Sequence, residues 1–78
     1  MDNKDELLSK LADTLQVDPK ELTDDFALTT ENWDSFAQLG AISVIDETFG
    51  ITVPANELKN CLTIGDLVNL VRQNLTTA

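Results

Sequence analysis

The sequence contains no histidine, one cysteine and only five basic residues, and each shortage argues against a class of function. Without histidine, a serine hydroxyl lacks the usual imidazole base, so a hydrolase that uses its own serine is poorly supported. A single cysteine, Cys61, excludes an internal disulfide and a thiolate-rich metal site. Because Cys61 lies among apolar neighbours, we interpret it as a small buried hydrophobe. The acids between residues 18 and 34 also lack the spacing of an EF-hand, so we expect neither an enzyme nor a metal protein.

Long apolar runs are absent as well, and no stretch approaches the length needed to cross a bilayer. Residues 1–6 are acidic where a secretory signal would be basic, so we expect a cytoplasmic protein that does not insert into membranes. The 78 residues are enough for one domain, residues 1–78, and we expect a monomer. A chain of this size buries only about 60% of its unfolded surface, which leaves little room for a complete enzyme site.

Charge of one sign dominates the middle of the chain. Fourteen acidic residues against five basic ones give a net charge of −9. Between Lys20 and Lys59 there is no basic residue, but there are eight acids: Glu21, Asp24, Asp25, Glu31, Asp34, Asp46, Glu47 and Glu57. We therefore expect neither nucleic acids nor anionic membranes as partners, because binding to either requires positive charge on the protein. The charge either serves solubility alone or docks the protein onto basic patches of other proteins.

The apolar spacing and the helix signals predict an all-α domain, a bundle of three longer helices and one short helix. We expect the first helix to begin near Asn3, where Asn3 to Glu6 resemble a capping box, and to end before Val17. Its buried side would comprise Leu8, Leu11, Ala12 and Leu15. A long loop over about residues 16–34 follows, with four apolar anchors, Val17, Leu22, Phe26 and Leu28, so we expect a functional segment.

The second helix is expected over residues 35–49 and ends at Gly50, which can adopt a positive φ. At 100° per residue its core stripe is Ala41, Ile42, Ile45 and Phe49. We call the opposite side the outer face; it comprises Phe36, Leu39, Gly40, Ser43, Asp46 and Glu47. A mixture of large apolar, small and acidic side chains favours a docking surface, although isolated exposed apolar residues are common.

Two shorter predictions complete the fold. Pro54 is well placed to open a short third helix that runs through Asn60. The last helix begins at Thr63, where Thr63 to Asp66 resemble a capping box, and it buries Ile64, Leu67, Val68, Val71 and Leu75. Residues 51–53 have some strand character, but a lone short strand has no partner here and is marginal.

The segment Trp33-Asp34-Ser35-Phe36 stands at the junction of the acidic loop and the second helix. Asp34 can cap the helix and leave the Ser35 hydroxyl outside the core, near backbone N–H groups that have no helical partner. A phosphate ester on that hydroxyl would be favoured by roughly 0.3–1 kcal/mol in the helix dipole. Taken alone, the pair Asp34-Ser35 also fits an ordinary N-cap. We expect Trp33 to cover the core.

The whole chain resembles the acyl carrier protein family. The resemblance rests on residues 17–23, on Asp34-Ser35-Phe36, which is similar to the family's Asp-Ser-Leu, on residues 45–54 and on residues 63–68. It implies that Ser35, next to Asp34, receives 4′-phosphopantetheine from coenzyme A through a separate Mg²⁺-dependent phosphopantetheinyl transferase. The thiol of that arm, not Cys61, would then hold an acyl or aminoacyl group as a thioester.

The resemblance also implies partner contacts. Phe36 and Leu39 match positions of apolar contact, and Asp46 and Glu47 match acidic docking positions, for acyl-transferring, acyl-activating and synthase enzymes that have basic patches. Such carriers serve fatty acid, polyketide or nonribosomal peptide type biosynthesis.

The chain departs from housekeeping carriers at three places: it lacks their glycine before Asp34, and it has Gly40 and Ser43 on the second helix. These departures suggest a specialised set of partners, and Trp33 could frame the arm. The alternative is an acidic helical interaction module that is never modified.

Overall fold

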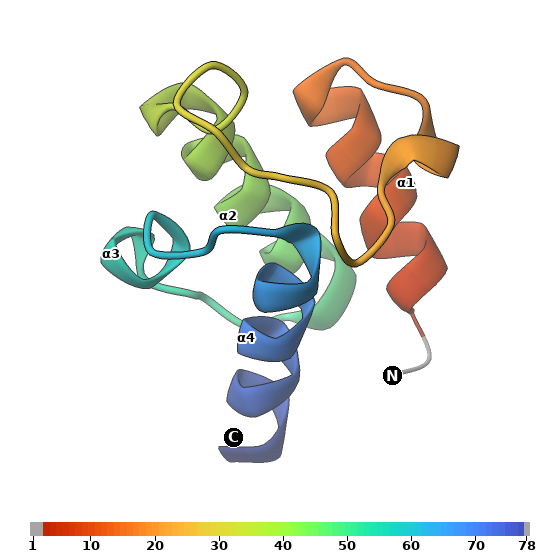
Figure 1. Cartoon of the computed structure of the whole chain (residues 1–78). Coiled ribbons are helices and arrows are strands. Elements are labelled where there is room, and N and C mark those ends of the chain that lie inside the picture. The colour runs from red at the N-terminus through yellow and green to blue at the C-terminus, as the bar shows by residue number, and fades with distance from the viewer. Residues whose placement is uncertain (1–2, 78) are drawn as a thin grey trace.

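The computed structural model describes residues 3–77, which form four α-helices and one short 3-10 turn (Figure 1). In chain order these are α1 (Lys4–Leu15), η1 (Pro19–Glu21), α2 (Ser35–Phe49), α3 (Ala55–Leu58) and α4 (Ile64–Thr77). The all-α prediction, with three longer helices, one short helix and a long connection between the first two, is confirmed. Met1, Asp2 and Ala78 lie outside the described residues, and the single domain stays a prediction.

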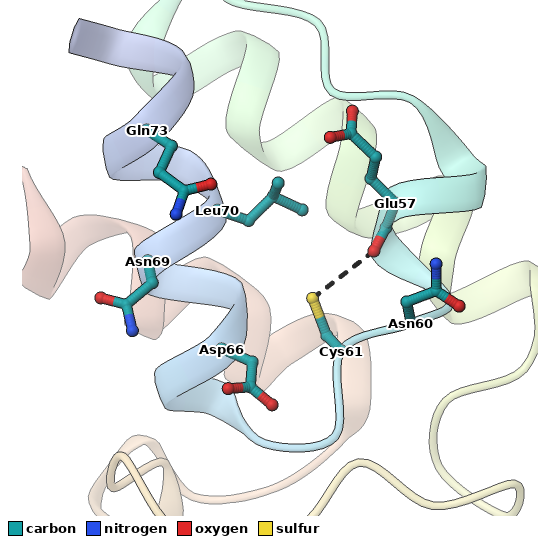
Figure 2. A pocket seen from close by; sticks show the side chains of 7 residues that line it. All are labelled: Glu57, Asn60, Cys61, Asp66, Asn69, Leu70 and Gln73. Carbon is teal, nitrogen blue, oxygen red and sulfur yellow. Dashed lines mark hydrogen bonds between the residues drawn. The ribbon is translucent and has the colours of Figure 1, made fainter.

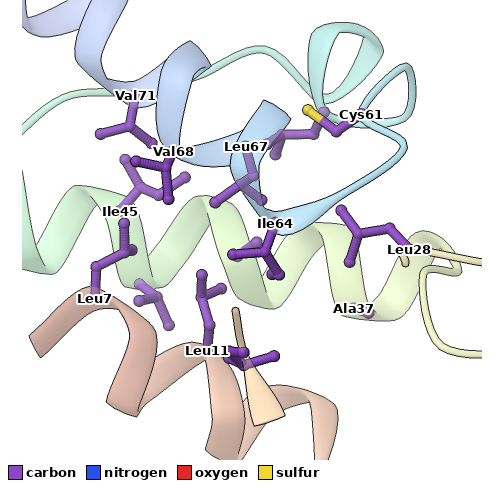
Figure 3. Close-up of a cluster of buried hydrophobic side chains, with 14 of the residues drawn as sticks. Leu7, Leu11, Leu28, Ala37, Ile45, Cys61, Ile64, Leu67, Val68 and Val71 are labelled. Atoms are coloured by element: carbon purple, nitrogen blue, oxygen red, sulfur yellow. The ribbon is translucent and has the colours of Figure 1, made fainter. Parts of the chain in front are cut away.

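The helices meet in one apolar core. Figure 3 shows Leu7 and Leu11 of α1, Ile45 of α2, and Leu67 and Val71 of α4 converging between the helices, and all five are fully buried. Every buried side chain among the described residues is apolar. Burial of each such Leu, Ile or Val side chain contributes roughly 1.5–3 kcal/mol, so these contacts hold the short bundle together.

Helix α1 has the predicted bounds, but its predicted capping box is wrong. The Asn3 backbone has φ −106° and ψ 23°, outside the extended conformation of a typical N-cap, and its side chain makes no capping hydrogen bond. The Asn3 amide instead donates to the Thr48 carbonyl oxygen at 3.5 Å, near the end of α2. Leu11 and Ala12 are buried as expected, Leu8 and Leu15 only partly, and Leu7 is buried although it was not expected.

The long connection is pinned by its apolar anchors, as predicted. Leu22 and Leu28 are buried, and Val17 and Phe26 pack partly against the core. The connection also pairs with the segment before α4: the Leu28 N–H donates to the Leu62 carbonyl at 2.9 Å. Figure 1 shows it crossing the molecule from α1 to the start of α2. The acidic loop therefore has a fixed path to the second helix.

The second half of the chain follows the prediction with small shifts. Pro54 is the N-cap of α3 rather than its first residue, and that helix ends at Leu58, before Asn60. The Thr63 hydroxyl accepts from the Asp66 N–H at 3.2 Å, while the Asp66 carboxylate accepts from the Leu62 N–H at 3.0 Å, one residue earlier than in a standard capping box. The expected core residues of α4 are buried except Leu75, which is partly buried. No helix within residues 3–77 combines the length and apolar character needed to span a bilayer.

Candidate functional site

The start of α2 is fixed by a side-chain cap. Asp34 has extended backbone, φ −87° and ψ −178°, and its Oδ1 accepts from the Ala37 N–H at 2.8 Å. Helix α2 then runs for 15 residues and ends at Gly50, whose φ of 71° is the left-handed conformation that glycine adopts readily. Both predicted ends of the helix are confirmed. Because Asp34 caps the helix, the Ser35 side chain is not needed as a cap.

Ser35 is the first residue of α2, and its side chain is exposed. Within residues 3–77, no hydrogen bond is made by its hydroxyl, and no acceptor lies against the backbone N–H groups of Ser35 and Phe36. Unpaired N–H groups and the helix dipole favour an anion at this end. A phosphate ester on Ser35 therefore fits the local geometry and electrostatics.

The segment before Ser35 is tied down by Trp33. The Trp33 side chain is only 6% exposed, and its Nε1–H donates to the Leu58 carbonyl at 2.9 Å, at the end of α3. The Gln38 side chain, one turn into α2, donates to the Trp33 carbonyl at 3.1 Å. The prediction that Trp33 covers the core is confirmed. It holds the backbone just before the serine against α3.

The outer face of α2 is exposed as predicted, except at one position. Phe36 is 81% exposed and Leu39 is 64% exposed, and Asp46 and Glu47 are exposed near the other end of the helix. Ser43 is exposed too.

Gly40 is the exception, and the prediction that it belongs to the outer face is wrong. A Cβ at this position would lie 2.7 Å from Thr14 Cγ2, so Gly40 faces α1 at a close helix crossing. Close packing at this crossing explains why the residue at position 40 is glycine.

Cys61 is buried and chemically quiet. It lies in a hollow between α3 and α4, where its Sγ–H donates to the Glu57 carbonyl at 3.7 Å (Figure 2). Burial, and then the nearby carboxylates of Asp66 and Glu57, raise the pKa of its thiol from 9.0 to about 11. The thiol is protonated near neutral pH, and its exposure of only 6% confirms the core interpretation. The described part of the chain holds no group of three or more metal-ligating side chains.

Two further features of the structure, at Leu62 and at Gln16, were not predicted from the sequence. Leu62, in the segment before α4, is 71% exposed. Gln16 ends α1 with a φ of 60°, the left-handed conformation. The conformation of Gln16 had no signal in the sequence, because glycine and not glutamine is usual at the left-handed position after a helix.

Comparisons with known proteins agree on one family. The family model described as a phosphopantetheine attachment site matches residues 5–71. The chain is 34% identical over 77 residues to "Acyl carrier protein" of Petrotoga mobilis, with 92% of this chain and 91% of the relative covered. It is 40% identical over 63 residues to "Acyl carrier protein MbtL" of Mycolicibacterium paratuberculosis, covering 80% and 71%. It is also 30% identical over 86 aligned positions to "Acyl carrier protein" of Acidothermus cellulolyticus, covering 97% and 96%. No solved structure gives a significant match.

Proposed function

Because the chain belongs to the acyl carrier protein family, whose cofactor is 4′-phosphopantetheine, we propose that Ser35 is the residue to which this arm is attached. One observation carries the choice of serine: Ser35 is exposed at the first position of a 15-residue helix that Asp34 already caps. The other two serines, Ser9 and Ser43, lie inside α1 and α2, where the backbone N–H groups are used within the helix.

Attachment is a phosphoryl transfer in which this chain supplies only the nucleophile. The Ser35 oxygen forms a bond to the β-phosphorus of coenzyme A, the pyrophosphate bond breaks, and 3′,5′-ADP leaves. The hydroxyl proton passes to a base on the transferase, since this chain has no histidine. Once bound, the arm supplies a terminal thiol on which acyl or aminoacyl groups are held as thioesters. The chain itself keeps the phosphate at a helix start, where an anion is favoured by roughly 0.3–1 kcal/mol.

Partner enzymes are proposed to bind the outer face of α2. Phe36 and Leu39 offer apolar contacts beside Ser35, and Asp46 and Glu47 offer negative charge farther along the same helix. Charged groups at the rim of an interface mainly speed encounter and leave affinity modest, which suits a carrier that must visit and leave several enzymes. The partners would be the phosphopantetheinyl transferase and acyl-transferring, acyl-activating or synthase enzymes with basic patches.

The attachment is tested by intact-mass measurement after incubation with coenzyme A and a broad-specificity phosphopantetheinyl transferase. We expect a gain of one phosphopantetheinyl group, lost in Ser35→Ala and retained in the control variants Ser9→Ala and Ser43→Ala. A wild-type chain that stays unmodified, or a Ser35→Ala chain that gains the group, would contradict the assignment. The first result would favour the unmodified interaction module.

The docking face is tested by charge reversal. Asp46→Lys with Glu47→Lys should slow association with the transferase and weaken its salt dependence, whereas Asp13→Lys on α1 should change neither. Asp13→Lys changes the net charge by half as much, so an effect about half as large in this variant would show that the net charge of the protein, and not the location of the acids, governs association. We further propose that the cargo belongs to fatty acid, polyketide or nonribosomal peptide type biosynthesis. The mass of the thioester on protein from its native source identifies it. Cytoplasmic location stays a prediction.

A further inference from the structure

A hollow of about 280 Å³ lies where the end of α1 approaches the start of α2, and we call it the α1–α2 hollow. Its walls come from three parts of the chain: Leu15 and Gln16 at the end of α1, Glu31 and Asn32 in the loop, and Asp34 and Phe36 at the start of α2. The last two residues flank Ser35 in the chain. The hollow therefore opens next to the proposed attachment point.

Gln16 is an unusual residue in this wall. It is the only non-glycine residue with a positive φ among residues 3–77, at φ 60° and ψ 45°. Left-handed backbone costs free energy for an L side chain, and helices that end in it usually place glycine there. The Gln16 backbone N–H is used to end the helix, on the carbonyls of Ala12 and Asp13. No hydrogen bond within the described residues accounts for its exposed side-chain amide, so local structure does not explain the choice of glutamine.

The chemistry of the walls selects the occupant. Leu15, Phe36 and Ala37 provide apolar surface, and Gln16 provides an amide that can donate and accept hydrogen bonds. No basic residue lines the hollow, and Glu31 and Asp34 bring negative charge, so a phosphate group is disfavoured inside. The pantetheine part of the arm is neutral, with two methyl groups, a hydroxyl and two amides. Its phosphate can stay outside, at the start of α2.

Resting on the attachment to Ser35, we propose that the pantetheine part of the arm lies in the α1–α2 hollow, with the Gln16 amide as its hydrogen-bonding partner. The competing hollow between α3 and α4, lined by Glu57, Asn60 and Cys61 among others, contains no residue of α2 (Figure 2). It is therefore not next to the serine in the chain. Phe36 lines the hollow and is 81% exposed, so it has surface for both the arm and a partner.

The proposal is tested by isotope-filtered nuclear Overhauser spectroscopy on ¹³C,¹⁵N-labelled protein that carries an unlabelled arm. We expect contacts from the two pantetheine methyl groups to Leu15, Gln16 and Phe36. Contacts to α3 or α4 instead, or no contacts at all, would overturn the proposal while Ser35 stays modified. A chain whose mass does not change would overturn the proposed function, and this inference with it. Mass and contacts thus separate the two failures.

Gln16→Gly provides the sharper variant, because glycine relieves the backbone strain and the fold is retained. Loss of one hydrogen bond should lower the docked population by about 2- to 10-fold, and the methyl contacts should weaken accordingly. The matched control is Asn60→Ala, which removes an exposed amide from the other hollow and should leave the contacts unchanged. Undiminished contacts in Gln16→Gly would remove Gln16 from the proposal, and equal losses in both variants would contradict the location.

Discussion

The close crossing of α1 and α2 at Gly40 gives a prediction that can be worked out in numbers. Gly40 lies inside α2, where glycine costs about 1 kcal/mol relative to alanine, so Gly40→Ala would normally stabilise the helix. Here, however, the added Cβ would lie 2.7 Å from Thr14 Cγ2, well inside van der Waals contact. The Thr14 hydroxyl donates to the Lys10 carbonyl at 3.2 Å, which holds the methyl group in place.

The balance of these two effects sets the expected magnitude. Overpacking of this kind costs about 1–3 kcal/mol, against the gain of about 1 kcal/mol in helix propensity. Gly40→Ala alone should therefore change the free energy of unfolding by between zero and about 2 kcal/mol, in the destabilising direction. Thr14→Ser removes only Cγ2 and keeps the hydroxyl. In that background, Gly40→Ala should stabilise the protein by about 1 kcal/mol.

Urea denaturation of the four proteins, wild type, both single variants and the double variant, measures the coupling directly. With a slope of about 1 kcal/mol/M for a small domain, the effect of Gly40→Ala should differ between the two backgrounds by about 1–3 M in midpoint. Equal stabilisation by Gly40→Ala in both backgrounds would refute the reasoning. The helices would then have room at this crossing, and packing would not explain the glycine.

Three further predictions follow from single contacts. Asp34→Ala should cost about 1 kcal/mol in urea denaturation, because the N-cap bond to Ala37 is lost, whereas Asp34→Asn should cost little. Trp33→Phe removes the indole bond to the Leu58 carbonyl, which still accepts from the Cys61 N–H at 3.1 Å, and should cost about 1 kcal/mol; an unchanged midpoint would show that water replaces the indole. Because folding raises the pKa of the Cys61 thiol from 9.0 to about 11, its contribution to stability is complete below pH 9 and is lost as the pH rises to about 11. Cys61→Ala should flatten that decline in urea midpoints, and a decline that persists unchanged would assign it to other groups.

The bounds of α2 illustrate what the sequence predicts well. The start at Ser35 and the end at Gly50 follow from local chemistry, because Asp34 caps its own helix and a left-handed residue after Phe49 strongly favours glycine. The exposure of Phe36 and Leu39 follows from helical spacing. The displayed serine, the central feature of the candidate site, could therefore be located before any coordinates.

The failures have a common physical cause, which is competition from distant parts of the chain. The residues around Asn3 match a local capping pattern, yet the Asn3 amide bonds to Thr48, 45 residues away. Helical spacing places Gly40 and Phe36 on the same side of α2, but it does not predict which other helix packs against that side. In the structure, α1 packs against Gly40, while Phe36 stays exposed. Gln16 has no strong backbone preference, so its left-handed conformation, and with it the α1–α2 hollow, appears only when α1 and the loop are placed together.

The hydrogen bonds around the serine make its substitution a clean test. The backbone there is held by the Asp34 cap on Ala37, by the indole of Trp33 on α3 and by the amide of Gln38, and none of these bonds uses the Ser35 side chain. The hydroxyl is exposed, so its removal creates no cavity and leaves no buried group unpaired. Alanine is also a strong helix former. Ser35→Ala should therefore unfold at the wild-type urea concentration, and any loss of modification in that variant must come from the missing oxygen, because the fold that presents it is intact.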